Sequence, residues 1–128
     1  MRKSQNRSLT VSIFNNEYKV IVCWGDRKFT KRIGCDWQYP KEIETVLRDQ
    51  NRGMCYFHSD CHPLIVLPKQ PETPEEIGTL AHEAVHAIDD IFSKLDEDYR
   101  SSHEVFAHSV GAVVRTVLLI AKKVPNRK

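Results

Sequence analysis

The chain has 128 residues, a hydrophobic fraction of 41% and a formal net charge of +2. This length suits one domain with one core, and the composition excludes a disordered chain. Acidic and basic residues are mixed along the sequence, so the weak net charge argues against a nucleic-acid surface. We therefore expect a single domain over residues 1–128.

The sequence carries no pattern typical of export or membrane insertion. Residues 1–10 are polar and lack the apolar stretch of a signal peptide. The most apolar segment, Val110–Ala121, contains Arg115 and is too short to span a bilayer. We expect a cytoplasmic protein with no membrane partner. Its four cysteines should remain thiols in a reducing compartment: Cys23, Cys35, Cys55 and Cys61.

The first third of the chain, Ser8–Gly34, predicts a three-stranded antiparallel meander. The segments LTVSIF, EYKVIVCW and KFTKRI are β-branched, aromatic or alternating, as strands are. Asn15-Asn16 and Gly25-Asp26 provide the intervening turns.

The middle of the chain predicts one helix and two strands. Pro40 opens PKEIETVLRDQN with a helix-start pattern, and Gly53 ends it. Met54–His58 predicts a short strand, and His62–Pro68 predicts a second, apolar one. Because proline cannot donate to a ladder, the prolines of the second strand favour a sheet edge.

Two long helices are predicted for the last third. Thr73, Pro74 and Glu76 form a capping-box pattern that starts a helix running to about Leu95. A further helix is predicted from about Ser102 to Lys122. The fold class expected from these patterns is α+β, with a small antiparallel sheet packed on the two helices.

The first of these helices carries His82-Glu83-Ala84-Val85-His86, which is H-E-x-x-H. Residues four apart lie on the same face of a helix, so both imidazoles can bind one metal ion. Glu83 sits beside them, where it can take a proton from a water molecule and pass it to a leaving amine. The predicted helix is the context that this motif requires.

A catalytic zinc usually has a third protein ligand, and the next helix offers several. Glu104 is the leading candidate, with His103 and His108 as rivals. His108 could equally serve as an outer-shell donor or oxyanion stabiliser. Asp90 or Asp89 could accept the second ring N–H of His86. Tyr99 is a weaker candidate for contacting the reacting carbonyl.

Simpler interpretations compete with each of these assignments. His82 and His86 could be exposed side chains next to an ion-pairing Glu83. The apolar flanks, Ala81, Ala84, Val85 and Ala87, argue against this because they indicate a helix buried on several sides. Cys55 and Cys61 with His58 and His62 have ligand chemistry but no usual zinc-finger spacing, so buried or free thiols are expected there. Trp24, Trp37 and Tyr39 are expected in the core.

The sequence HEAVH, followed on the next helix by HEVFAH, resembles the small gluzincin metallopeptidases, and most of all the short metallopeptidase-like proteins of bacteriophage genomes. SprT-like proteases and the peptidase domains of ImmA/IrrE regulators are more distantly similar. The resemblance covers Pro63 to Val117; before that it concerns the architecture alone. No tyrosine or histidine stands at a family-typical oxyanion position.

This resemblance implies Zn²⁺ bound by His82, His86 and Glu104, with Glu83 as the general base. It also implies that the strand before the motif helix, through Leu64, Ile65 and Val66, pairs with an extended substrate. The expected function is zinc-dependent hydrolysis of a peptide or protein, such as a host protein if the chain is phage-encoded. The alternative is a catalytically inactive zinc protein that acts by protein–protein contact. A third hypothesis, nucleic-acid binding through the basic termini, is disfavoured by the weak net charge.

Overall fold

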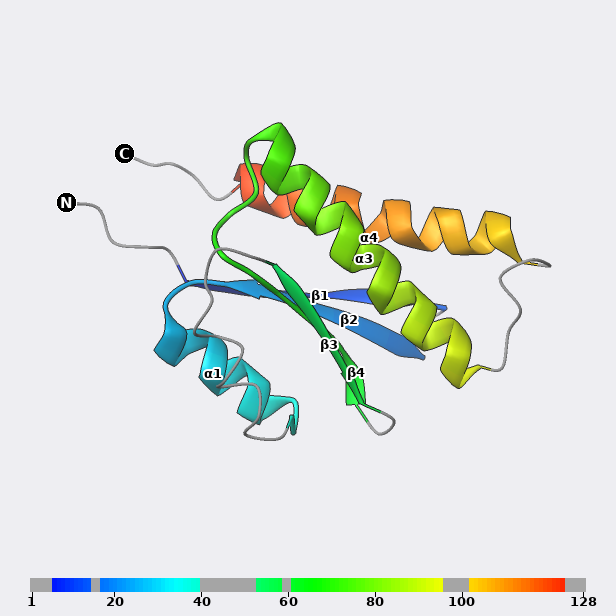
Figure 1. Cartoon of the computed structure of the whole chain (residues 1–128), viewed down its shortest axis with the longest axis horizontal. Helices are drawn as coiled ribbons and strands as arrows, with labels where there is room; N and C mark the ends of the chain where they lie inside the picture. The colour runs from blue at the N-terminus through cyan, green and yellow to red at the C-terminus, as the bar shows by residue number, and fades with distance from the viewer. Residues whose placement is uncertain (1–5, 15–16, 40–52, 59–60, 96–101, 124–128) are drawn as a thin grey trace.

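The computed structural model describes residues 6–14, 17–39, 53–58, 61–95 and 102–123. These residues form four strands and three helices (Figure 1), in an α+β arrangement. In chain order they are β1 Arg7–Ile13, β2 Tyr18–Trp24, α1 Arg27–Asp36, β3 Met54–His58, β4 Cys61–Leu67, α3 Pro74–Lys94 and α4 His103–Lys123. The expected strands at β1 to β4 and the two long helices are confirmed. The helix expected from Pro40 onward and the Asn15-Asn16 turn lie outside the described residues.

The sheet is mixed, not antiparallel as predicted. Its strand order is β1-β2-β4-β3. The pairs β1–β2 and β3–β4 are antiparallel, whereas β2 and β4 are parallel at its centre. Parallel neighbours need a long crossover connection, and the stretch between β2 and β4 begins with α1. The antiparallel meander therefore ends after two strands.

The predicted third strand of that meander, KFTKRI, is helix α1. Asp26 caps this helix, because its Oδ1 accepts a hydrogen bond of 2.8 Å from the backbone N–H of Phe29. Thr30, Ile33 and Gly34 are buried and recur at helical spacing. The alternation of apolar and polar residues in this short segment fits both periods, and the N-cap favours the helix.

Gly25 makes the turn from β2 into α1 with a positive φ of 142°. Asn6 lies so close that a Cβ at this position would meet its Oδ1 at 2.3 Å. The same oxygen accepts a hydrogen bond of 2.8 Å from the backbone N–H of Asp26. Glycine is therefore required both by the backbone conformation and by this close approach.

The strand predicted to lie at an edge, β4, is in the interior of the sheet. Leu64, Ile65 and Val66 each pair with β2 on one side and β3 on the other. The run Leu64–Leu67 is buried throughout, as is typical of a strand covered on both faces. Pro63 precedes the first residue of β4 that pairs with β2, and Pro68 lies just beyond the end of the strand. A substrate strand cannot pair with these three residues, so that prediction is wrong.

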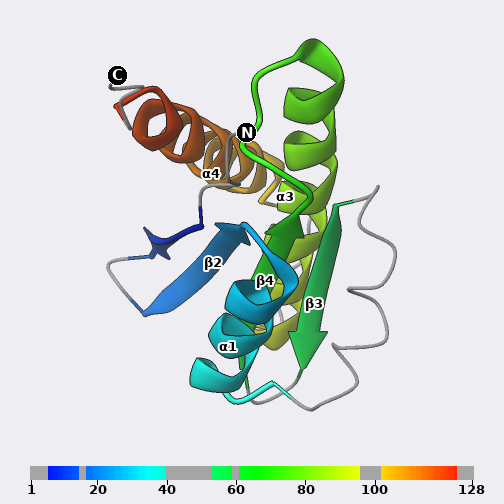
Figure 2. The same cartoon turned by 90° about the vertical axis from the view of Figure 1, so that its left-hand side faces the viewer.

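Helices cover both faces of the sheet (Figure 2). The face of α3 and α4 encloses the larger core, including Val20, Val22, Trp24, Ile65, Ile88 and Val117. The face of α1 encloses a smaller core, including Ile21, Cys23, Ile33, Tyr39 and Leu64. Trp24 and Tyr39 are buried as predicted, and Trp37 packs against the smaller core.

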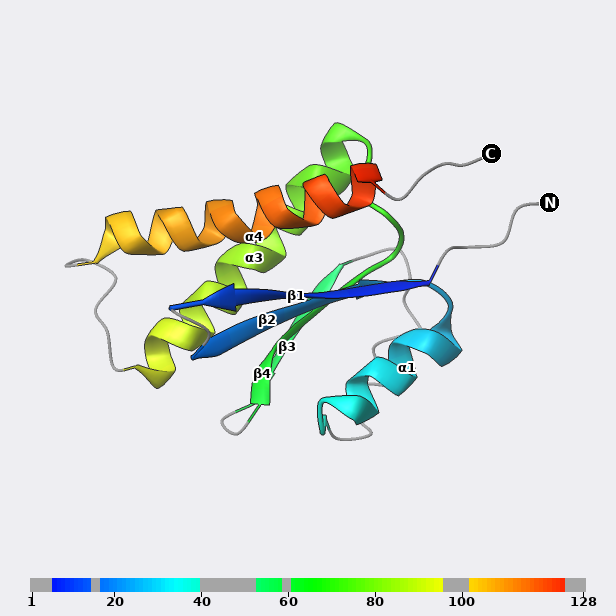
Figure 3. The ribbon, with the colours of Figure 1, turned by 180° about the vertical axis from the view of Figure 1, so that it is seen from behind.

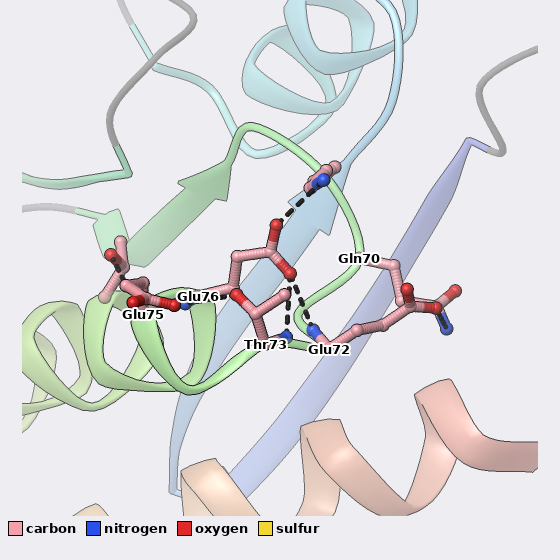
Figure 4. Close-up of polar contacts among 7 residues, drawn as sticks. Gln70, Glu72, Thr73, Glu75 and Glu76 are labelled. Atoms are coloured by element: carbon pink, nitrogen blue, oxygen red, sulfur yellow. Dashed lines mark hydrogen bonds and ion pairs between the residues drawn. The ribbon is translucent and has the colours of Figure 1, made fainter.

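Helix α3 begins with the predicted capping box (Figure 4). Thr73 Oγ1 accepts a hydrogen bond from the backbone N–H of Glu76, and Glu76 Oε1 accepts one from the backbone N–H of Thr73. Glu76 also forms an ion pair of 2.9 Å with Lys69. These contacts fix where the helix begins and therefore the register of the H-E-x-x-H residues along it.

Tyr39 joins the irregular part of the β3–β4 pair to the chain after α1. The register shifts between Tyr56 and His58, and the Tyr39 hydroxyl contacts the carbonyl oxygens of Tyr56, at 2.9 Å, and His62. These carbonyls would otherwise have poor ladder partners at the shift. Burial raises the pKa of Tyr39, which keeps its hydroxyl a donor.

Helix α4 packs beside α3 and along β1, as Figures 1 and 3 both show. Within the described part of the chain it is the one helix long and apolar enough to cross a membrane by length and composition alone. Its buried side, with Val113 and Val117, belongs to the larger core. Of its apolar window 28% is buried inside the fold, and one such helix is weak evidence for a membrane span.

Candidate metal centre

His82 and His86 stand together on the exposed face of α3. Their Nε2 atoms are 3.3 Å apart. The rings meet edge to face, with centroids 4.9 Å apart and an interplanar angle of 74°. The helix brings the two imidazoles to one point, as the spacing predicts. Both are open to solvent, so a ligand can reach them without any rearrangement of the core.

Glu83 lies between these two histidines and the sheet, and it is only 8% exposed to solvent. Its Oε2 is 4.0 Å from Nε2 of His82. Burial raises the pKa of Glu83, while the two neighbouring histidines and the backbone N–H of Cys55 on β3 act against that rise. The carboxylate is thus held by a strand on one side and faces the imidazoles on the other.

The start of β3 approaches α3 closely at Gly53. A Cβ on Gly53 would meet Thr79 Cγ2 at 2.6 Å and Glu83 Cγ at 3.5 Å. Thr79 is one turn before Glu83 on the same helix face. Glycine therefore allows the strand to come near enough for the Cys55 backbone to reach the Glu83 carboxylate.

Glu104, the predicted third ligand, does not join the two histidines. It is exposed on the first turn of α4, where its Oε1 is 3.9 Å from Nε2 of His108. Two residues on, Phe106 packs against Phe92, with ring centroids 5.1 Å apart. Phe92 lies about 9 Å further along α3 than His86 and about 120° around it. In the described ranges no three His, Cys, Asp or Glu residues come together as a metal site.

The other predicted site residues have different partners or positions. Asp90 forms an ion pair of 2.7 Å with Lys94, whose Nζ also donates to the carbonyl oxygen of Cys61. Asp90 is thereby engaged with a cation, not with His86 as predicted. His103 and Asp89 are exposed. Tyr99 lies outside the described residues.

The four cysteines carry free thiols and occupy separate positions. Cys23 is buried in the smaller core, and burial raises its pKa to about 12. Burial also raises the pKa of Cys55. Cys61 packs on the opposite face of the sheet from Cys55. His62 accepts a hydrogen bond at Nδ1 from the backbone of Lys19, which gives it a role in the sheet.

The expectation of a motif helix buried on several sides is met in part. Ala84 and Ala87 are fully buried, but Val85 is 43% exposed, on the open side of the helix with the two histidines. The sequence did not predict three contacts near the candidate site, those made by Gly53, by the Cys55 backbone and by Lys94. In the sequence Gly53 indicates a helix stop, and a glycine next to a strand also indicates close approach of another element.

Comparison with protein-family models, with curated proteins and with solved structures gives no match to this chain. The chemistry of the site therefore rests on its geometry and on the residue types that form it.

Proposed function

We propose that the chain binds zinc through His82 and His86 and hydrolyses peptide bonds there, with Glu83 as the general base. The separation of 3.3 Å between the two Nε2 atoms carries this proposal. Nitrogen ligands at roughly 2.0–2.1 Å from a tetrahedral zinc lie about 3.3–3.4 Å from each other. The same separation also allows a weak hydrogen bond between the two rings, with a direction set by their tautomers. The imidazoles are thus already spaced for a metal ion.

Glu83 has the surroundings that a base at this site needs. Zinc bound there would polarise a peptide carbonyl and make a nearby water molecule more acidic. The Glu83 carboxylate can take the proton of that water and deliver it to the departing amine. The Cys55 backbone contacts the carboxylate, and burial raises the pKa of Glu83, which favours uptake of that proton.

Zincin-like packing and a Glu104 ligand are the finer parts of the proposal. The motif helix on a sheet, with a second helix beside it, is compatible with that packing. For Glu104 to bind the same ion, the first turn of α4 would have to move from its position next to Phe92 toward the exposed face of α3. The substrate would be a peptide or protein, including a host protein if the chain is encoded by a phage.

An extended substrate would pair with β3 in place of β4. β3 is an edge strand among the described residues, and its backbone already meets Glu83. Met54 and Phe57 on this strand are 36% and 54% exposed, which offers apolar contacts to a peptide. Edge strands bind extended peptides through their free backbone groups.

A second candidate is a zinc protein that acts by contact and does not hydrolyse anything. Two observations favour it: both histidines are exposed, and no third ligand accompanies them in the described part of the chain. This alternative predicts that a partner binds stoichiometrically and that Glu83→Gln leaves the binding unchanged.

Zinc titration with a matched set of variants tests the site. We expect one zinc per chain, with the affinity reduced at least about tenfold in His86→Ala, because loss of even an outer-shell partner costs that much. Cys35→Ser is the control, since it removes an exposed side chain of metal-binding chemistry on α1, away from the motif helix. Equal losses in both variants, or binding lost only in Cys35→Ser, would place the metal elsewhere.

Peptide-library cleavage by the zinc-loaded chain separates the two candidates. We expect Glu83→Gln to abolish cleavage while keeping zinc, because the amide cannot take up the proton. Cleavage at the parental rate in this variant would exclude Glu83 as the base. Zinc binding with no cleavage by the parent would favour the contact-only alternative.

A further inference from the structure

We propose that the outer edge of β1, together with the adjoining flank of α4, is a self-association surface that pairs with a second copy of this chain. The copies would join β1 to β1 in antiparallel fashion, extending the sheet across a two-fold axis. This surface lies at the opposite edge of the sheet from β3 and does not depend on the proposed function.

Strand β1 has the properties of an edge that can accept a partner. Among the described residues it is the terminal strand of the sheet, and all seven of its residues pair with β2 in unbroken register. It contains no proline or bulge and, apart from Arg7 at its first position, no charged side chain, and these are the devices that usually protect an edge. The other edge, β3, has five residues and an irregular register. Of the two edges, β1 is the better template for pairing.

The sequence of β1 is complementary to itself about Thr10. In an antiparallel pair centred there, Ser8 faces Ser12 of the copy and Thr10 faces Thr10. These three side chains are exposed and hydroxylated, so they form the cross-strand pairs that hydroxyl groups favour. On the other face, half-buried Leu9 meets buried Val11 of the copy. No like charges face each other.

Helix α4 carries a partly exposed apolar column. Val105, Ala112 and Leu119 are seven residues apart and therefore lie along one side of the helix. Val105 is 47% and Leu119 is 53% exposed. By contrast, Val110, Val114 and Leu118 on the other side pack against the larger core.

Helix geometry places this column on the β1 side of the molecule. Figure 2 shows α4 from its C-terminal end, with β1 below it and α3 to its right. From that end, successive positions of a right-handed helix advance counter-clockwise. Since the buried residues of α4 face the larger core, this helix geometry puts the Val105–Ala112–Leu119 column on the flank of α4 away from α3. We therefore infer that the column is adjacent to the outer edge of β1 among the described residues.

Helix α4 would take part in the same association because it packs along the strand that pairs. Helix α3 packs on β3 and β4, whereas α4 packs along β1. In the two-fold pair, the second α4 therefore lies on the same face of the joined sheet as the first, next to it, and we expect the exposed apolar column to meet its copy there.

Disulfide trapping tests the register in a Cys35→Ser background, since Cys35 is the exposed native cysteine. In Thr10→Cys the two new thiols face each other, at the Cα separation of about 4.5–5.5 Å that suits a disulfide. In Ser8→Cys they are about 13 Å apart along the strands. We expect rapid cross-linking of Thr10→Cys, slow cross-linking of Ser8→Cys, and rapid cross-linking when Ser8→Cys and Ser12→Cys are mixed. Equal rates for Thr10→Cys and Ser8→Cys would overturn the proposal.

Sedimentation of the full chain over a wide concentration range tests the helix contribution. We expect a concentration-dependent dimer whose dissociation constant rises at least about tenfold in Leu119→Glu, because a desolvated contact is replaced by a charge. Ala107→Glu is the control, since Ala107 is exposed on the other side of α4. A monomer at every concentration, or the same effect in both variants, would overturn the proposal.

Discussion

Gly53 shows how much of the site depends on one missing side chain. Replacement by alanine would force a Cβ to within 2.6 Å of Thr79 Cγ2, a methyl group held by a stiff β-branched side chain. We expect Gly53→Ala to destabilise the fold by about 1–3 kcal/mol, the usual cost of overpacking. Denaturant unfolding measures this directly.

Gly78 provides the matched control for that substitution. It lies within α3, and a Cβ there would meet nothing within 4 Å. Gly78→Ala should therefore stabilise the chain by about 0.5–1 kcal/mol, through the better helix propensity of alanine. Equal effects of the two substitutions would show that the close approach of β3 to α3 is unimportant.

The ion pair between Asp90 and Lys94 links the end of α3 to the sheet. The two side chains are only 11% and 18% exposed, and Lys94 also donates to the Cys61 carbonyl oxygen. Lys94→Met should cost about 2–3 kcal/mol, somewhat below the cost of breaking a fully buried pair, because it leaves a carboxylate without its cation. Adding Asp90→Asn should recover part of that loss, and purely additive effects in the double-mutant cycle would contradict the coupling.

At the residue scale, the sequence correctly predicted that His82 and His86 meet, but it did not predict where Glu104 lies relative to them. His82 and His86 meet because their spacing lies within one helix and needs no tertiary information. Glu104 belongs to another helix, and its position depends on the crossing of α3 and α4 and on the connection between them. That crossing is set by packing such as Phe92 against Phe106, which no local pattern encodes.

Among the elements, α3 has the most complete set of start signals. Thr73→Ala removes the side-chain acceptor of the capping box and should cost about 1 kcal/mol of stability. Glu76→Gln should have a smaller effect at neutral pH, because glutamine can still reach back to the N-cap backbone.

Glu76 also gives this cap a defined pH dependence. The ion pair with Lys69, followed by hydrogen bonds from the Thr73 and Glu72 backbones, lowers its pKa from 4.5 to about 2. A lowered pKa means that the stabilisation is complete above pH 4.5 and is lost as the pH falls toward 2. The stability advantage of the parent over Glu76→Gln should disappear across that window in thermal unfolding. An advantage that persists at pH 2 would contradict this assignment.

Helix α1, which the sequence predicted as a strand, illustrates the limits of short patterns. Its apolar residues fit strand alternation over six positions and helical spacing equally well, and only the Asp26 cap favours the helix. The same ambiguity explains β4. Four consecutive buried residues indicated an interior strand, whereas the prolines beside them suggested an edge.

For the whole molecule, the α+β class followed from the patterns and the topology did not. Each strand except the misassigned third was recognisable from its residues, and both hairpins join neighbours in sequence. The parallel pairing of β2 with β4 depends on where the chain returns after a long connection. Such a connection leaves no periodic signal, and the misassignment of α1 removed the crossover that would have indicated it.

The parallel pairing of β2 with β4 is the central seam of the sheet, and it joins two hairpins that lie apart in the sequence. The pairs β1–β2 and β3–β4 are hairpins that can form from local contacts, whereas Ile21 and Leu64, paired at the seam, are brought together from opposite ends of a long loop. Closing that loop loses chain entropy before the β2–β4 contacts can compensate for the loss, so we expect this pairing to form late in folding. Tyr39 and Lys94 both reach β4 near its first residues and hold it from opposite sides. Because β3, β4 and α3 follow one another along the chain, Glu83 can meet the Cys55 backbone before β2 pairs with β4, so this half of the candidate site does not depend on the slow step.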